Sequence, residues 1–189
     1  MSTAPKAVRL AADVAKPLAL SQGATGLLAA QMTPRQFFEA LAAVPALADD
    51  AIRFLAAALP KREAVWWGVL CLKDGLLKPL DPVAAKAIAT AETWVKDASE
   101  ANRRAAGVAA DAAGPGTAAG CLAAAAFWSG GSLNAPHLAP VPPREDLTGT
   151  AVAGAILLAT IATPPTPAAA KAKFIATGTE IASGRQKLA

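Results

Sequence analysis

One segment of the sequence, residues 60–76, constrains the fold more than any other. It opens with a proline and a charged turn, and then places apolar side chains on almost every side of a helix. Val65 lies on one stripe of this helix, Trp66 widens the stripe, and Trp67 adds a third face, because successive residues of an α-helix are rotated by about 100°. A helix that is apolar nearly all round is buried. Other helices of the chain, or a partner, must therefore cover this segment.

Prolines and capping residues divide the rest of the chain into further helices. Thr33 is a suitable N-cap, Pro34 fits the first helical position, and Gln36 completes a capping box. Asp81 and Pro82 mark another helix start in the same way. The alternating patterns typical of strands are absent from the sequence. We therefore expect an all-α fold, either a compact bundle or stacked helical hairpins of seven to eight helices. The expected helices span residues 33–44, 47–59, 61–76, 82–95, 100–113, 117–128, 147–162 and 168–183.

The length of 189 residues is that of one domain. Residues 1–31 carry prolines and glycines among short apolar groups, and we expect an N-terminal arm there, with one short helix near residues 24–31. Residues 32–189 are expected to form a single helical domain. A long proline-rich connection at residues 130–145 interrupts this domain.

Large side chains are scarce in this chain. Hydrophobic residues make up 54% of it, but aromatic residues only 5%, and tyrosine is missing. Most of the apolar content is alanine, which buries little area per residue but lets helices approach closely. The core must therefore depend on a few large anchors. These are Phe37, Phe38, Phe54, Trp66, Trp67, Trp94, Phe127, Trp128 and Phe174.

Charge and hydropathy exclude several classes of partner. The net charge is +4 without a run of five or six like charges, so no nucleic-acid partner is expected. The apolar stretches at 117–128 and 150–163 are shorter than the roughly 18 residues that cross a bilayer, so no stable membrane insertion is expected. Cys71 and Cys121 lack metal-ligand spacing and are expected to be free thiols in a reducing compartment. The N-terminus lacks a signal-peptide pattern, and we expect a cytoplasmic protein.

The chain carries no recognisable catalytic set. His137 is the single histidine and lies in the proline-rich connection without an acidic neighbour. The acidic residues form no Glu-x-x-His pair of the kind that binds metals in helical bundles, so neither a metal nor another cofactor is expected. Ser129-Gly130-Gly131-Ser132 follows a helix, which favours a glycine C-cap over an anion-binding loop. These observations indicate that the protein is not an enzyme.

The two adjacent tryptophans have two interpretations. Both fill the core, or one of them faces outward beside charged residues and forms an interface hot spot. The second interpretation predicts a surface that binds another protein and includes the corner after the helix at 117–128. The predicted partner-binding residues are Lys61, Arg62, Glu63, Trp66, Trp67, Trp128 and Ser129.

Arg62 carries a prediction of its own. It lies in the first turn of its helix, where the helix dipole favours negative charge and disfavours an arginine. We therefore expect a carboxylate elsewhere in the fold, or a partner, to hold Arg62. The candidate carboxylates are Asp49, Asp50 and Asp97.

Four stretches of the sequence carry a resemblance. They are residues 55–67, which include Pro60-Lys61-Arg62-Glu63-Ala64-Val65-Trp66-Trp67, then Thr93-Trp94-Val95, Arg103-Arg104-Ala105-Ala106, and Phe127-Trp128-Ser129-Gly130-Gly131-Ser132. Together they resemble an uncharacterised bacterial family of alanine-rich helical proteins, a domain of unknown function, over residues 33–184. The family that the chain resembles is associated with type VI secretion gene neighbourhoods. It implies a cytoplasmic accessory or adaptor role and assigns no catalytic residue.

Three classes of function follow from these observations. We expect a non-enzymatic cytoplasmic adaptor, accessory or chaperone-like protein that binds another protein and is linked to a bacterial secretion system. A peripheral or membrane-inserting helical protein is an alternative, because mean hydropathy is +0.37 and Gly116 and Gly120 have the spacing of a membrane-dimer motif. An enzyme with an unrecognised site near residues 129–137 is another.

Overall fold

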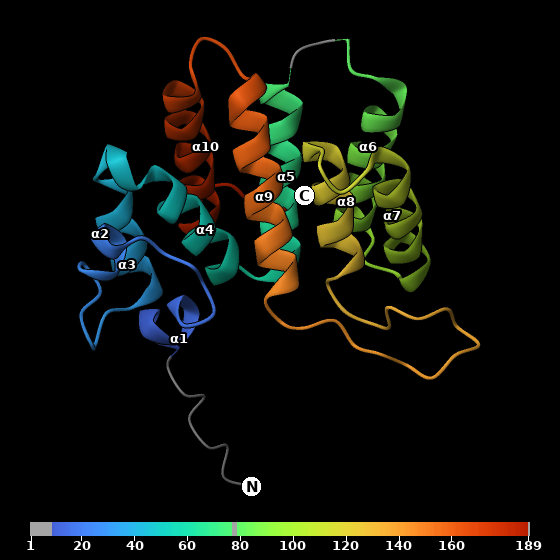
Figure 1. The fold of residues 1–189 in the computed structure, drawn as a ribbon, viewed down its shortest axis with the longest axis horizontal. Coiled ribbons are helices and arrows are strands. Elements are labelled where there is room, and N and C mark those ends of the chain that lie inside the picture. The colour runs from blue at the N-terminus through green and yellow to red at the C-terminus, as the bar shows by residue number, and fades with distance from the viewer. Residues whose placement is uncertain (1–8, 77–78, 189) are drawn as a thin grey trace, which may run out of the picture.

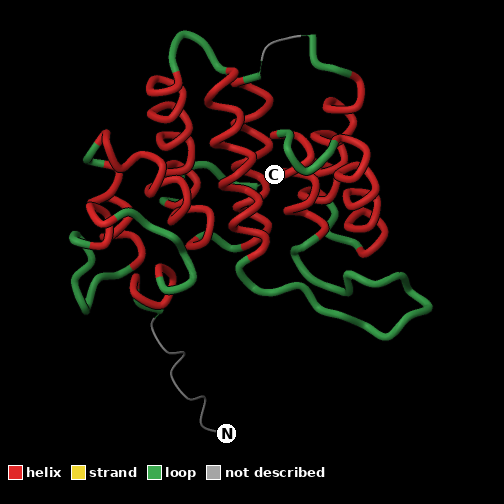
Figure 2. Tube along the Cα trace, in the orientation of Figure 1, coloured by secondary structure: helices red, strands yellow, loops and turns green. Residues whose placement is uncertain are grey.

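The computed structural model describes residues 9–76 and 79–188, and all regular structure in these residues is helical (Figures 1 and 2). This part of the chain contains ten α-helices, eight of them longer than one or two turns, and no strand. The expected all-α class is therefore confirmed, and the eight longer helices match the expected seven to eight.

The bounds of the helices follow the expected ones closely. In chain order they are α1 (Ala11–Ala15), α2 (Gln22–Thr25), α3 (Pro34–Ala42), α4 (Ala48–Ala58), α5 (Lys61–Gly75), α6 (Pro82–Lys96), α7 (Glu100–Ala113), α8 (Ala118–Phe127), α9 (Leu147–Ala162) and α10 (Pro167–Ala182). A single 3-10 turn, η1 (Pro45–Leu47), precedes α4. Each of the helices from α3 onward begins within one residue of its expected start.

Local capping explains this agreement. The Thr33 hydroxyl accepts the amide hydrogen of Gln36 at 3.2 Å, and the Gln36 side chain accepts that of Thr33 at 3.0 Å. One carboxylate oxygen of Asp81 accepts the amide hydrogens of Val83 and Ala84, both at 3.0 Å. These bonds pair amides that the first helical turn leaves without partners. Four other helices begin with the same kind of cap, from Ser21, Ser99, Thr117 and Thr166.

Helix α5 lies at the centre of the fold, with α4, α6, α8, α9 and α10 packed against it (Figure 1). Val65, Trp67 and Leu72 on this helix have no exposed surface. Gly68 approaches α8 so closely that a Cβ there would lie 2.6 Å from Cδ1 of Leu122. The expectation that several helices cover this segment is confirmed.

Helices α8 and α9 complete the core with small side chains. Both are apolar around most of their circumference, and their alanines let the backbones approach closely. The alanines without exposed surface on these helices are Ala123, Ala125, Ala126, Ala155 and Ala159.

Within residues 9–76 and 79–188, no helix has both the length and the apolar character needed to cross a bilayer. The spacing of Gly116 and Gly120 has a local explanation. A Cβ on Gly120 would collide with the carbonyl oxygen of Gly114, whereas one on Gly116 would meet nothing. Gly120 therefore allows the first turn of α8 to close against the preceding loop.

The N-terminal segment packs on the domain over its described part, residues 9–31. The backbone amide and hydroxyl of Ser21 both donate to the buried carboxylate of Asp50, at 3.0 and 2.7 Å. The amide of Ala11 donates to the carbonyl of Met32 at 2.8 Å. The short helix expected near residues 24–31 lies instead at Gln22–Thr25, and α1 precedes it. Residues 1–8 of the expected arm lie outside the described residues, and the boundary after residue 31 stays a prediction.

Both cysteines are free thiols, as expected. Cys71 is buried in α5, where burial and then the nearby charge of Asp74 raise the pKa of its thiol. Cys121 is half-buried on α8, and its thiol donates to the carbonyl of Pro115 at 3.2 Å.

Candidate functional site

The charged residues in the first turn of α5 contact different neighbours, because successive side chains of a helix are rotated by about 100°. The ammonium group of Lys61 lies 2.9 Å from the carboxylate of Glu145, just before α9. Arg62 turns toward the end of α6. Glu63 lines a hollow of about 270 Å³ bounded by α3, α4 and α10. These predicted site residues therefore do not form one continuous face.

The partner of Arg62 differs from the expected one. Its Nε donates to the carbonyl of Val95 at 2.6 Å, and Nη2 donates to that of Lys96 at 2.9 Å. The last carbonyls of a helix lack intrahelical partners and carry the negative end of the helix dipole. Arg62 thus caps the C-terminus of α6, and the prediction of a carboxylate partner is wrong.

The three candidate carboxylates have partners elsewhere. Asp49 pairs with Lys171 at 2.7 Å, and Asp50 accepts the two bonds from Ser21. Asp97 accepts a hydrogen bond from the side-chain amide of Asn102 at 2.9 Å.

The structure separates the two adjacent tryptophans. Trp67 has 0% of its surface exposed, and its indole Nε1 donates to the carbonyl of Phe174 on α10 at 2.8 Å. Trp66 is half-buried and turns toward α6. Trp67 therefore belongs to the core, and Trp66 is the member of the pair that reaches the surface.

Trp66 lines a hollow of about 370 Å³ between α5, α6 and the C-terminal residues, called the Trp66 hollow below. Its walls combine apolar side chains with a charged rim. The apolar members are Trp66, Val69, Leu70, Val95 and Leu188, and the charged members are Lys73, Asp74, Glu92, Lys96 and Lys187.

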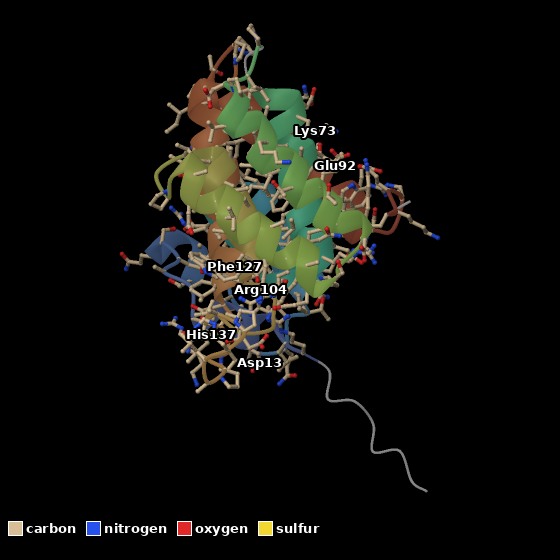
Figure 3. The ribbon with its side chains drawn as sticks, turned by 90° about the vertical axis from the view of Figure 1, so that its right-hand side faces the viewer. Asp13, Lys73, Glu92, Arg104, Phe127 and His137 are labelled. Atoms are coloured by element: carbon tan, nitrogen blue, oxygen red, sulfur yellow. The ribbon has the colours of Figure 1, made fainter. Side chains whose placement is uncertain are left out.

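Lysines outnumber carboxylates on the rim of the Trp66 hollow, three to two. Lys73 donates to Glu92 at 3.0 Å, and the two side chains lie next to each other in Figure 3. Lys96 lies 3.2 Å from the other oxygen of the same carboxylate. The hydrogen bond from Lys73, followed by that from Lys96, lowers the pKa of Glu92. Glu92 thus stays ionised and ties α5 to α6 at the rim of the hollow.

A buried arginine organises the corner after α8. Arg103 on α7 is 3% exposed, and its guanidinium forms two bonds with the carboxylate of Glu100, at 2.6 and 2.7 Å. It also donates to the carbonyls of Phe127 and Ser132, at 2.6 and 2.9 Å, and lies 4.7 Å from the centroid of the Phe127 ring. The five donors of an arginine side chain suit such a set of acceptors. Arg103 therefore fixes the chain direction from the end of α8 into the next loop.

Gly131 makes room for the arginine at this corner, whereas a Cβ on Gly130 would meet nothing. Gly131 has a φ of 63°, in the left-handed region, and a Cβ there would lie 2.8 Å from the Arg103 guanidinium. Trp128 and Ser129 are both half-buried at the C-terminal end of α8. The expected glycine C-cap of α8 is wrong, because the C-cap is Trp128, with a φ of −83°, and the left-handed Gly131 lies three residues beyond it.

The connection from Trp128 to the start of α9 contacts both predicted binding regions, which are the first turn of α5 and the corner after α8. Arg103 and Arg104 hold its first part, the latter by donating to the carbonyl of Asn134 at 3.0 Å. Lys61 on α5 pairs with Glu145 near its end. Figure 3 places Arg104 and Phe127 above His137, which is exposed on this connection.

Sequence reasoning gave Arg103 no structural role of its own. The signal that could have found it is the Glu100-x-x-Arg103 spacing, which brings the two charges to one side of a helix. The Gly130-Gly131 pair was the second sign, because glycines mark places of close approach.

Within residues 9–76 and 79–188, no group of three or more His, Cys, Asp or Glu residues could hold a metal ion. A search of curated proteins found no match to the chain, and neither did a search of solved structures. The model of DUF6931, a family of unknown function, matches residues 37–182, from the middle of α3 to the end of α10. The chain therefore belongs to the DUF6931 family of unknown function.

Proposed function

We propose that this protein is a non-enzymatic accessory or adaptor protein that binds another protein through the Trp66 hollow. The observation that carries the proposal is the separation of the tryptophans, which leaves Trp66 in a surface hollow beside other apolar side chains. A half-exposed tryptophan surrounded by a polar rim has the composition of an interface hot spot.

The charge of the rim supports a partner of definite chemistry. Three lysines and two carboxylates surround the apolar floor. Lys73 and Lys96 share the single carboxylate of Glu92, and Asp74 pairs with Lys173 outside the rim, so the rim keeps an excess of positive charge. A partner segment that offers an apolar side chain to Trp66 and carboxylates to the lysines would complement both. The proposed ligand of the hollow is therefore an acidic amphipathic segment of another protein.

The test is capture of partners by the tagged full-length chain from its own cells, quantified by mass spectrometry. Trp66→Ala should remove one reproducible partner, whereas Val108→Ala, a matched loss of an exposed apolar side chain on α7, should retain it. The captured protein should then bind the purified chain more weakly when Lys73 and Lys96 are both changed to glutamine. Equal capture by Trp66→Ala and by the unchanged chain would exclude the hollow as the binding site.

The cellular setting belongs to the same proposal. A cytoplasmic location and a link to type VI secretion rest on the sequence resemblance, and fractionation of the native cells together with the neighbouring genes tests them. The alternatives are a membrane-associated protein and an enzyme with a site near residues 129–137. In that region the Ser132 hydroxyl accepts the amide hydrogens of Asn134 and Val141, at 3.1 and 3.0 Å. These two hydrogen bonds favour a structural role for Ser132 over a catalytic one.

A further inference from the structure

The connection of residues 128–146 between α8 and α9 is unusually long for a compact helical domain. It extends away from the helices at the lower right of Figure 1. Connections longer than about 12 to 15 residues without regular structure are uncommon, and those that persist are functional or disordered. Hydrogen bonds within residues 132–143, called the proline loop below, show whether this connection is ordered.

Hydrogen bonds give the proline loop a defined shape. The amide of Leu133 donates to the carbonyl of Val141 at 2.8 Å, which joins its two arms. The side chain of Asn134 donates to the carbonyl of Ala139 at 2.7 Å. The amide of Leu138 donates to the carbonyl of Ala135 at 3.0 Å and closes a turn at the tip. Together with the arginine contacts at its base, these bonds make the loop a built feature of the fold.

The returning arm of the proline loop, residues 139–143, is stiff because three of its residues are prolines. Pro140, Pro142 and Pro143 fix their own φ angles near −65° and push the residues before them into extended conformations. The arm is therefore close to a polyproline II segment before any partner binds. A segment that is already extended loses little conformational entropy on binding.

The proline loop exposes apolar side chains at its tip and on this arm. Leu138 is 53% exposed and Val141 is 46% exposed, and Pro136, Pro140 and Pro142 are exposed beside them. His137 is the only ionisable side chain between Trp128 and Pro143. The exposed surface is thus apolar and nearly uncharged, which excludes an electrostatic partner such as nucleic acid.

We infer that the proline loop is a docking element that lies in an apolar, aromatic-lined groove of a second protein. Proline-rich segments are recognised in such grooves, where tyrosine and tryptophan side chains pack against prolines. A lipid surface fits less well, because the loop carries no lysine or arginine to meet lipid headgroups. The inference goes beyond the Trp66 hollow and uses different residues.

The first part of the test is site-specific photocrosslinking of the full-length chain in its own cells, with benzoylphenylalanine at position 138. The matched control has the same group at position 161, because Ile161 is a highly exposed apolar residue on α9. The expected result is an adduct with one protein from position 138 only, at a peptide rich in aromatic residues. Lipid adducts, or the same adducts from both positions, would overturn the inference.

The second part measures affinity with the purified crosslinked protein. Leu138→Asp combined with Val141→Asp should weaken binding at least tenfold, and Leu138→Ser should weaken it less, while Ile161→Asp should leave it unchanged. Arg104→Ala should give an intermediate loss, because it removes the donor to the carbonyl of Asn134 but leaves the apolar side chains in place. Trp66→Ala should not affect this binding, so the proposals for the Trp66 hollow and for the proline loop can be rejected independently of each other. Unchanged affinity in the double variant, with its melting temperature intact, would overturn the proposal.

Discussion

The surroundings of Trp67 and of Arg103 both bury a large side chain, but different forces hold the two. Trp67 lies among apolar side chains of several helices and makes one hydrogen bond, to Phe174. Arg103 is held by an ion pair, two carbonyls and an aromatic ring. Burial of apolar area depends little on pH, whereas ion pairs depend on it and on salt. The comparison therefore predicts that the core and the proline loop respond to different perturbations.

The largest expected effect concerns the two tryptophans. Trp67→Ala should lower the free energy of unfolding by about 3 to 5 kcal/mol, because it leaves a cavity in the core and removes the donor to Phe174. Trp66→Ala should lower it by only about 1 to 2 kcal/mol, since that side chain is half-buried. Chemical denaturation of both variants checks this. Equal losses would mean that Trp66 is as much a core residue as Trp67.

The next effect should separate local from global stability. Arg103→Met should lower the free energy of unfolding by about 2 to 3 kcal/mol, because it leaves the carbonyls of Phe127 and Ser132 without their charged donor. Hydrogen exchange should rise in the proline loop and change much less in α5. Arg104→Met is the milder control, because it loses one loop contact. Uniformly faster exchange along the whole chain would show that the corner and the core are one cooperative unit.

A pH titration gives a smaller effect with a definite sign. Hydrogen bonds from Arg103, and further contacts with Arg104, lower the pKa of Glu100 to about 2 from an ordinary value of 4.5. A carboxyl with a lowered pKa in the folded state stabilises the fold above its unfolded pKa. This contribution should be present at pH 6 and be lost as the pH falls from about 5 toward 2.

The matched variant for this titration is Glu100→Gln. The carboxylate of Glu100 is 54% exposed, so solvent screens the pair and the change in stability should be modest. The sharper measurement is hydrogen exchange of Leu133 and Asn134 as a function of pH. Protection there should fall between pH 5 and pH 2 in the unchanged chain and be low and constant in the variant. Parallel pH profiles in the two proteins would contradict the assigned role of Glu100.

The helices could be predicted because their signals are local. The cap formed by Thr33 and Gln36, and that formed by Asp81, depend on residues at most three positions apart. The apolar circumference of residues 61–76 likewise required burial wherever the neighbours came from. These features are fixed before the helices meet, so tertiary structure changed them little.

The candidate site could be predicted only in part, because its decisive contacts join distant residues. Arg62 was recognised as needing a partner, but the carbonyls of Val95 and Lys96 carry no sequence signature. The side of the helix that α10 covers decided which tryptophan is buried. Arg103 was missed because a buried and an exposed arginine look alike until the loop it holds is in place.

The smallest expected effect concerns the ion pair at the end of the connection that leads into α9, and it sharpens the comparison between the core and the proline loop. The ion pair between Lys61 and Glu145 spans 2.9 Å, but the Glu145 side chain is 92% exposed. Such pairs contribute about 0 to 1 kcal/mol, because water screens them and both side chains lose freedom. Lys61→Gln should therefore change the free energy of unfolding by less than about 0.5 kcal/mol and leave exchange in the proline loop unaltered. Denaturation at low and at 1 M salt provides the control, since an effective surface pair would weaken with salt. A clear loss of loop protection in Lys61→Gln would show that the loop depends on both ends, and that Arg103 and Arg104 alone do not hold it.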